Sequence, residues 1–142
     1  MDEFIVMRVN ESLSTFLGDY INQGGLLLHW RNFGSSGFIH RPEGGVLRNY
    51  NQCSDNETLS TSSRTDNPRG YTKSISNTKT LTDRTVCNPH ICGDAVYYDE
   101  NMNVDYSNVS FSKVALNHYR VKSWDDFTLK RNAMKAIGGV HN

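Results

Sequence analysis

Two carboxylates at the start of the chain are the first residues whose types suggest chemistry. Asp2 and Glu3 stand directly before residues 4–7, a short apolar run typical of a buried strand. A carboxylate held at a sheet edge suits Mg²⁺ or Mn²⁺, which bind one or two such groups together with phosphate oxygens. The alternative is a solvated acidic segment without a ligand, because adjacent acidic residues are common on protein surfaces.

A second group of polar side chains lies near the other end of the sequence. His118, Lys122 and Ser123 follow one another where a predicted strand over residues 114–121 meets a predicted helix. Free amide groups at a helix N-terminus favour anions, a histidine can bind a metal, and a lysine neutralises phosphate. The pattern therefore predicts an anion or metal site, or else only a capped helix after a polar strand.

Three cysteines offer a further possibility. Cys87, His90 and Cys92 lie within six residues, but a structural zinc ion needs four ligands and no second pair has the required spacing. Because the number of cysteines is odd, at least one lacks a partner within the chain. We expect free thiols or one local disulfide, and a zinc-binding module is the weakest alternative.

The spacing of apolar residues predicts the elements that must position these groups. Leu13, Phe16, Leu17, Tyr20 and Ile21 indicate an amphipathic helix capped by Ser12. The predicted strands cover residues 4–7, 26–33, 73–75, 95–99 and 114–121. A last helix begins at Ser123 and ends at Gly138, with its apolar face formed by Trp124, Phe127, Met134 and Ile137. This order of elements predicts an α/β fold.

Length and charge exclude several classes of protein. The 142 residues suit one domain, and 15 basic residues against 15 acidic ones leave no broad basic face for nucleic acid. No apolar run approaches the roughly 18 residues of a membrane span. Between residues 54 and 85, 14 of 32 positions are Ser or Thr. Because such a composition buries little apolar surface, we expect a flexible loop at 54–70.

Five segments, taken in order, resemble motifs of glycosyltransferase family 92 and the related family-2-like glycosyltransferases. The chain's first residues resemble the end of their Asp-x-Asp-Glu-Phe motif. Residues 30–37, followed by 41–44, resemble a Trp-x-x-Phe-Gly-Ser-Ser-Gly-His segment and its proline-containing turn. Residues 73–75 resemble a Lys-Ser/Thr-Ile strand, and residues 88–90 the histidine that follows it. Residues 117–127 resemble the closing His-Tyr-x-x-Lys-Ser-x-x-Glu-Phe motif.

The resemblance implies a GT-A type, Rossmann-like enzyme that moves a sugar from a nucleotide-sugar donor to a carbohydrate or glycan acceptor. It also implies a divalent cation, Mn²⁺ or Mg²⁺, bound to the donor diphosphate. By this likeness the metal ligands are Asp2 and His118, the diphosphate-binding residues are Lys122 and Ser123, and the acceptor-binding residues are Trp30, Ser35, Ser36 and Gly37. Glu43 and Asp99 are candidates for the catalytic base by residue type alone.

The sequence also departs from the family pattern. Met1 takes the middle position of the metal motif, so its first Asp is missing, and Phe38 stands where a histidine is usual. These departures predict that residues 1–142 are a single partial domain, the metal-edge and acceptor half, inactive without a nucleotide-binding half. The longer protein would belong to the secretory pathway as a membrane-anchored enzyme or to a bacterial cytoplasm.

Two further expectations follow. If the likeness holds, Asp2 and His118 lie at one edge of the sheet although they are far apart in the sequence. The alternative function is a non-catalytic carbohydrate-binding or interaction fragment. In that case Trp30, Phe33 and Tyr119 would stack on sugar faces without turnover.

Overall fold

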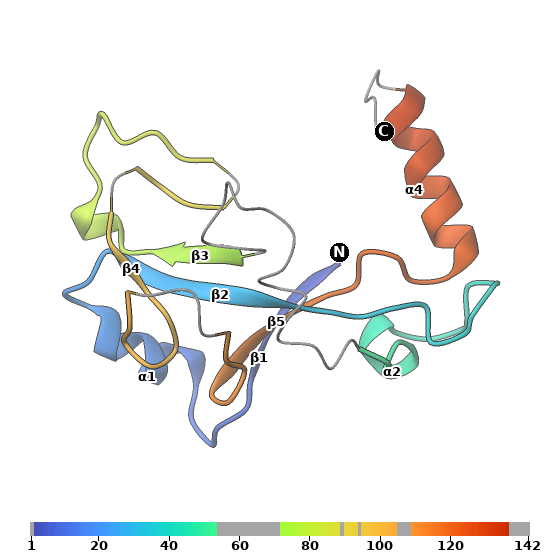
Figure 1. Ribbon diagram of the computed structural model, residues 1–142, viewed down its shortest axis with the longest axis horizontal. Coiled ribbons are helices and arrows are strands. Elements are labelled where there is room, and N and C mark those ends of the chain that lie inside the picture. Colours follow the sequence, from blue (N-terminus) through green and yellow to red (C-terminus); the bar gives the residue numbers. More distant parts are fainter. Residues whose placement is uncertain (1, 54–71, 89, 94, 105–108, 137–142) are drawn as a thin grey trace. The chain divides into compact units, whose positions relative to one another are not determined.

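The computed structural model describes residues 2–53, 72–88, 90–93, 95–104 and 109–136. It has mixed α/β content (Figure 1). The strands are β1 (Glu3–Met7), β2 (Gly25–Asn32), β3 (Thr72–Ser76), β4 (Tyr97–Tyr98) and β5 (Val114–His118). The helices are α1 (Leu13–Leu17), α2 (Val46–Asn49) and α4 (Trp124–Ala136), with short 3-10 helices η1 (Gly18–Tyr20) and η2 (Thr78–Thr80).

The chain divides into two compact units. One, which we call the sheet unit, comprises Phe4–Arg31 and Asp55–Leu116. The other, the helix unit, comprises Met1–Glu3, Asn32–Ser54 and Asn117–Asn142. No helix of the described ranges has both the length and the apolar character needed to cross a membrane.

The described strands form one five-stranded mixed sheet. Its order is β1-β5-β2-β3, and β4 pairs with β2 outside this path. β3 runs antiparallel to β2, with Leu26 opposite Ile75, whereas β4 runs parallel to β2. The α/β class predicted from the sequence is therefore confirmed at this level.

β2 is a central strand of the sheet, and residues on both of its faces are buried. On one face Leu26 and Leu28 pack with Phe16 and Tyr20 of the α1–η1 segment and with Val114 and Leu116 of β5. On the other face Leu27 is 1% exposed and His29 is 5% exposed. An uninterrupted run of buried residues is typical of a central strand.

Two glycines at the start of β2 allow its neighbours to approach closely. A Cβ atom on Gly24 would lie 2.3 Å from the carbonyl oxygen of Val96. A Cβ on Gly25 would lie 2.3 Å from the carbonyl oxygen of Ile75, in β3. Any side chain here would push β3 and β4 away from β2, so these positions require glycine.

The helix unit is organised around a tight turn and the first turn of α4. Ser36 and Gly37 have φ values of 51° and 84°, and the amide of Phe38 donates to the carbonyl of Ser35 at 3.0 Å. Positive φ at both central positions is typical of a type I′ turn. The hydroxyl of Ser36 then accepts the amides of Asn51 and Gln52, which joins the turn to the segment after α2.

Several element boundaries differ from the sequence-based expectation. The predicted helix over 13–21 is α-helical only to Leu17 and continues as η1, because Gly18 starts a 3-10 turn. The expected strands 95–99 and 114–121 are shorter, as β4 and β5, and α2 was not expected. Trp124 of the predicted apolar face contacts the ring of Phe127 but is 59% exposed. The loop at 54–70 and the helix end at Gly138 lie outside the described residues.

A buried carboxylate fastens the connection into β5. Glu100 is 4% exposed, and one of its oxygens accepts from both hydroxyls of Ser110 and Ser112 and from the Ser112 amide. The other oxygen accepts the amides of Lys113 and Val114 at 2.9 and 2.8 Å. Burial by itself would raise the pKa of Glu100, but these hydrogen bonds outweigh it and lower the pKa.

The first prediction concerns this carboxylate. Because its pKa is lowered by folding, Glu100 stabilises the fold above the ordinary value of 4.5, and the stabilisation is lost as the pH falls below it. Glu100→Gln should lower the free energy of unfolding by about 2 kcal/mol at pH 7 and flatten its decline in acid. Urea titrations from pH 7 to pH 3 measure both effects. An equal loss in the exposed control variant Glu11→Gln would contradict the assignment.

Candidate functional site

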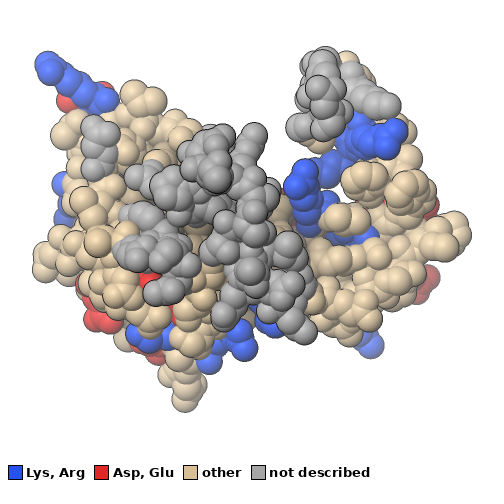
Figure 2. Space-filling model, viewed as in Figure 1, with Lys and Arg blue, Asp and Glu red and all other residues tan. Residues whose placement is uncertain are grey.

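The described part of the helix unit contains an open pocket of about 410 Å³ beside α4. Four cationic and two anionic side chains line it, together with three apolar ones: Arg41, Arg120, Lys122 and Lys130; Asp2 and Asp126; Val121, Leu129 and Ala133. Figure 2 shows Lys and Arg side chains gathered beside α4. The lining thus carries two more positive than negative charges, which favours an anionic ligand.

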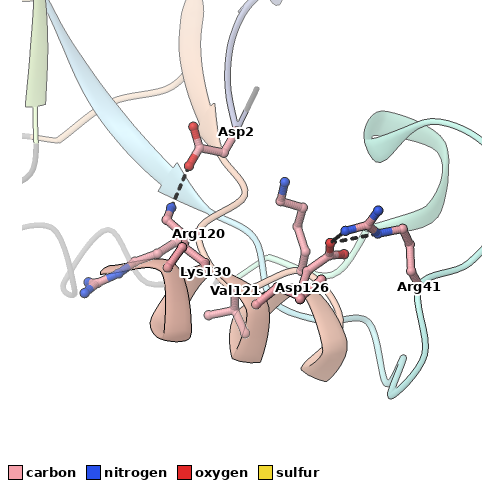
Figure 3. A pocket seen from close by; sticks show the side chains of 9 residues that line it. Asp2, Arg41, Arg120, Val121, Asp126 and Lys130 are labelled. Carbon is pink, nitrogen blue, oxygen red and sulfur yellow. Dashed lines mark hydrogen bonds and ion pairs between the residues drawn. The ribbon is translucent and has the colours of Figure 1, made fainter. Parts of the chain in front are cut away.

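Asp126 is the most firmly held charge of the pocket. One oxygen of its carboxylate accepts from two nitrogens of Arg41 (Figure 3). The other oxygen accepts from the hydroxyls of Ser123 and Tyr50 at 2.9 and 3.3 Å. Burial opposes the charged form, but the hydrogen bonds from Arg41 and Ser123 outweigh it and lower the pKa of Asp126. Arg41 and Asp126 therefore neutralise each other.

The first amides of α4 are already bonded, contrary to the expectation of free N–H groups there. The amides of Trp124 and Asp125 donate to the carbonyls of Phe38 and Ile39 at 3.3 and 3.1 Å. The amide of Asp126 donates to the Ser123 hydroxyl at 3.2 Å. An anion in this pocket must therefore be held by side chains and not by the helix N-terminus.

Asp2 forms the second ion pair of the pocket. Lys130, which is two turns into α4, donates to Oδ2 of Asp2 at 2.8 Å (Figure 3). This hydrogen bond lowers the pKa of Asp2. The side chains of Lys130 and Asp2 are 47% and 38% exposed, so the pair is weaker than that between Arg41 and Asp126.

Arg120 and Lys122 supply the surplus positive charge. Neither has a carboxylate within ion-pair distance among the residues that the structure describes. Lys122 adopts the left-handed region with φ of 53°, between β5 and α4. Arg120 and Lys122 both lie on the short connection between the end of β5 and the start of α4.

His118 lies beside Asp2, as the sequence predicted. The amide of Tyr119 donates to the carbonyl of Asp2 at 2.7 Å, which aligns the ends of β5 and β1. Nδ1 of His118 is 3.3 Å from the amide oxygen of Asn32, and Nε2 is 3.9 Å from a carboxylate oxygen of Glu3. Burial lowers the pKa of His118 although Glu3 and Asp2 act in the opposite direction, so the ring is neutral at pH 7.

The metal-ligating side chains at this edge are few. Within the described ranges no group of three His, Cys, Asp or Glu side chains could hold a metal ion. Asp2 turns its carboxylate to the Lys130 ammonium, which leaves only His118 and Glu3 near each other. Both of these also make other interactions.

The serine and glycine residues of the predicted site have structural roles here. Ser123 is fully buried, and its hydroxyl bonds Asp126 as the N-cap of α4. Ser35 accepts the Gly37 amide at 3.3 Å, and Ser36 holds the segment after α2 as described above. Lys122 is thus the only predicted diphosphate-binding residue whose polar group lies in the pocket unbonded to a described residue.

The candidate catalytic bases lie in different units. Glu43 is exposed in the turn before α2, and its carbonyl accepts from Asn49 at 2.8 Å. Asp99 belongs to the sheet unit and is 2% exposed. Its carboxylate accepts the amides of Asn101 and Asn103 at 2.8 Å each, which closes the turn after β4.

The aromatic residues proposed to stack on sugars are mostly enclosed. Phe33 and Tyr119 stack on each other with ring centroids 4.6 Å apart and are 8% and 2% exposed. Trp30, in the sheet unit, is partly buried, and its ring centroid is 5.8 Å from that of His90. The expectation that Phe33 and Tyr119 present open ring faces was therefore wrong.

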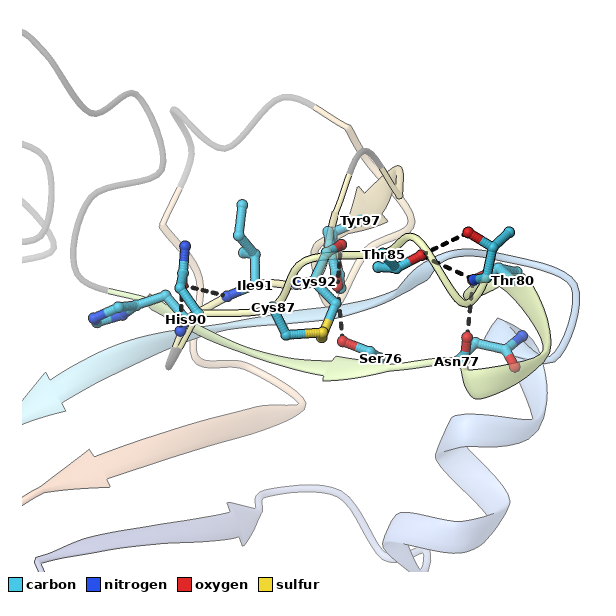
Figure 4. The surroundings of a disulfide bond; sticks show 11 residues. Ser76, Asn77, Thr80, Thr85, Cys87, His90, Ile91, Cys92 and Tyr97 are labelled. Carbon is cyan, nitrogen blue, oxygen red and sulfur yellow. Dashed lines mark hydrogen bonds between the residues drawn. A yellow bond between two sulfur atoms is a disulfide. The ribbon is translucent and has the colours of Figure 1, made fainter.

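The cysteine cluster forms a disulfide between Cys87 and Cys92 (Figure 4). Tyr97 bonds the backbone of Cys92 and the hydroxyl of Ser76 beside it. Nδ1 of His90 is 2.8 Å from the carbonyl oxygen of Thr72, in β3. Of the two arrangements expected, thiols or a local disulfide, the structure has the disulfide, and bonded cysteines cannot serve as zinc ligands.

Four charged residues of the pocket were not predicted from the sequence. Three of them, Arg41, Arg120 and Lys130, are cations, and the fourth is Asp126. One signal was present: Asp126 and Lys130 are four residues apart in α4, which places them on one helix face. The pairing of Lys130 with Asp2 joins residues 128 positions apart, so no local pattern indicates it.

Comparisons of this chain with models of protein families, with characterised proteins and with solved structures gave no match.

The second prediction tests the anchoring of α4. Asp126→Asn should lower the free energy of unfolding by about 1–2 kcal/mol, because it weakens the bonds from Arg41 and Ser123. Asp125→Asn is the matched control, since Asp125 is 45% exposed and bonds only the exposed His40 among the described side chains. Its loss should stay within about 0.5 kcal/mol. Equal losses in the two urea titrations would refute this assignment.

Proposed function

We propose that the pocket beside α4 binds the diphosphate of a nucleotide-sugar donor, and that the chain is part of a GT-A type glycosyltransferase. One observation carries the proposal. Each carboxylate of the pocket already has its own cation, so Arg120 and Lys122 remain as unneutralised positive charges at one short connection. A diphosphate supplies the matching negative charges.

The resemblance of the sequence to the glycosyltransferase motifs supports the same conclusion. In those motifs the Lys-Ser pair that matches Lys122 and Ser123 lies near the donor diphosphate. Here Lys122 lines the pocket, whereas Ser123 fixes the helix start that positions it. The resemblance and the charge distribution of the pocket thus both support Lys122 as a diphosphate-binding residue.

The chemistry that the pocket would support is stabilisation of a leaving group. When a sugar leaves its nucleotide, the diphosphate gains negative charge in the transition state. Guanidinium and ammonium groups placed beside it, Arg120 and Lys122, would be bound more strongly as that charge develops. The sugar acceptor and the base that deprotonates it are left to other residues.

The third prediction tests this function by binding, and no sugar transfer is expected from the partial domain alone. UDP, GDP and inorganic pyrophosphate titrated calorimetrically into the chain should bind, with an affinity that falls as salt is added. Lys122→Ala and Arg120→Ala should each weaken binding about tenfold, because a hydrogen bond to a charged group contributes roughly 1.5 kcal/mol. Sugar transfer from a panel of nucleotide sugars is assayed in parallel.

Arg48→Ala is the matched control for these variants. Arg48 is an exposed cation of the same unit, on α2, and does not line the pocket. Its replacement removes the same charge from the chain and should leave the affinity for UDP unchanged. The proposal fails if none of the three ligands binds, or if Arg48→Ala weakens binding as much as Lys122→Ala.

A further inference from the structure

We propose that Asp2 holds Lys130 in the absence of ligand, and that the pocket binds its diphosphate with Lys130 in place of a divalent cation. This inference rests on the proposed function, because it concerns the same ligand. It differs from what the resemblance implies, in which Asp2 is a ligand of Mn²⁺ or Mg²⁺. The argument depends on what already faces the carboxylate of Asp2.

The Lys130 ammonium stands at the place that a metal ion would need. Its Nζ atom is 2.8 Å from Oδ2 of Asp2, within direct hydrogen-bond distance. A divalent cation bound to Oδ2 would have to lie about 2.0–2.1 Å from it, so Lys130 must leave that oxygen before a metal ion can bind there. Both side chains line the pocket, so the positive charge is presented to the ligand itself (Figure 3).

The ion pair is weak enough for a ligand to redirect Lys130. The two side chains are 47% and 38% exposed, and exposed ion pairs contribute little because water screens them. A diphosphate offers several anionic oxygens against the single carboxylate of Asp2. Lys130 can therefore turn from Asp2 to the phosphate without the loss of a strong interaction.

The other ion pair of the pocket does not behave in this way. The Asp126 side chain is only 11% exposed and also accepts from Ser123 and Tyr50. Arg41 is therefore retained by Asp126, and the mobile charge of the pocket is Lys130. With Arg120 and Lys122 it makes three cations available to one diphosphate, which is sufficient charge without a metal ion.

The two interpretations of Asp2 predict opposite effects of one substitution. If Asp2 binds a metal, Asp2→Asn weakens diphosphate binding, and EDTA weakens it in the unaltered protein. If Asp2 only holds Lys130 in the absence of ligand, Asp2→Asn removes a negative charge beside the ligand and releases the ammonium. Binding should then become about threefold tighter, the factor for one unit charge at roughly 6 Å in water.

The fourth prediction is tested by titrating UDP and inorganic pyrophosphate calorimetrically in EDTA and in Mn²⁺. The unaltered chain should bind equally well in both, Asp2→Asn should bind more tightly, and Lys130→Met should bind more weakly. In a double-mutant cycle, the gain from Asp2→Asn should shrink when Lys130 is also replaced, because Asp2 acts through it. Thermal unfolding of each variant checks that the fold is retained.

The outcomes separate this inference from the proposed function. UDP binding that requires Mn²⁺ and is weakened by Asp2→Asn overturns the inference but leaves the donor site in place. Mn²⁺-dependent binding that is lost in Glu3→Gln also overturns it and assigns the cation to Glu3 and His118, whose Oε1 and Nε2 atoms are 3.9 Å apart. No binding under either condition overturns both proposals.

Discussion

The helix unit depends on the carboxylate of Asp126, because three separate segments donate hydrogen bonds to it. Ser123 donates from the start of α4, Arg41 from the loop before α2, and Tyr50 from the end of α2. A carboxylate accepts several hydrogen bonds at once and stays charged only if they outweigh its desolvation. Asp126 meets this condition, and the connection that carries Arg120 and Lys122 is therefore fixed in place.

The same arrangement decides how the pocket can hold an anion. The loop at Phe38 and Ile39 places its carbonyl groups against the first two amides of α4. The helix dipole is thereby matched by backbone oxygens, and the usual anion site at a helix N-terminus is already filled. Under the proposed function, the long cationic side chains of the pocket would bind the diphosphate instead. Their flexibility suits a ligand that has several equivalent oxygens.

The sequence indicates much of this fold but little of the site. Short apolar runs predict β1, β2 and β5, and the N-cap pattern at Ser123 predicts the start of α4. Each of these patterns is read from a few consecutive residues. β4 consists of two residues, too few for any periodicity, and α2 follows two glycines without an apolar face. The contact of Asp2 with Lys130 joins segments 128 positions apart, so the sequence did not indicate it, and the metal role of Asp2 came from the family resemblance.

The two ion pairs of the pocket show why burial, and not charge alone, separates a structural group from a functional one. Besides Arg41, the Asp126 carboxylate accepts from the hydroxyls of Ser123 and Tyr50, so it cannot exchange partners without leaving buried donors unbonded. Asp2 and Lys130 meet in partial contact with water, where either can exchange its partner at small cost. Under the proposed function, a diphosphate would therefore compete with Asp2 for Lys130, because Lys130 is held less firmly than Arg41.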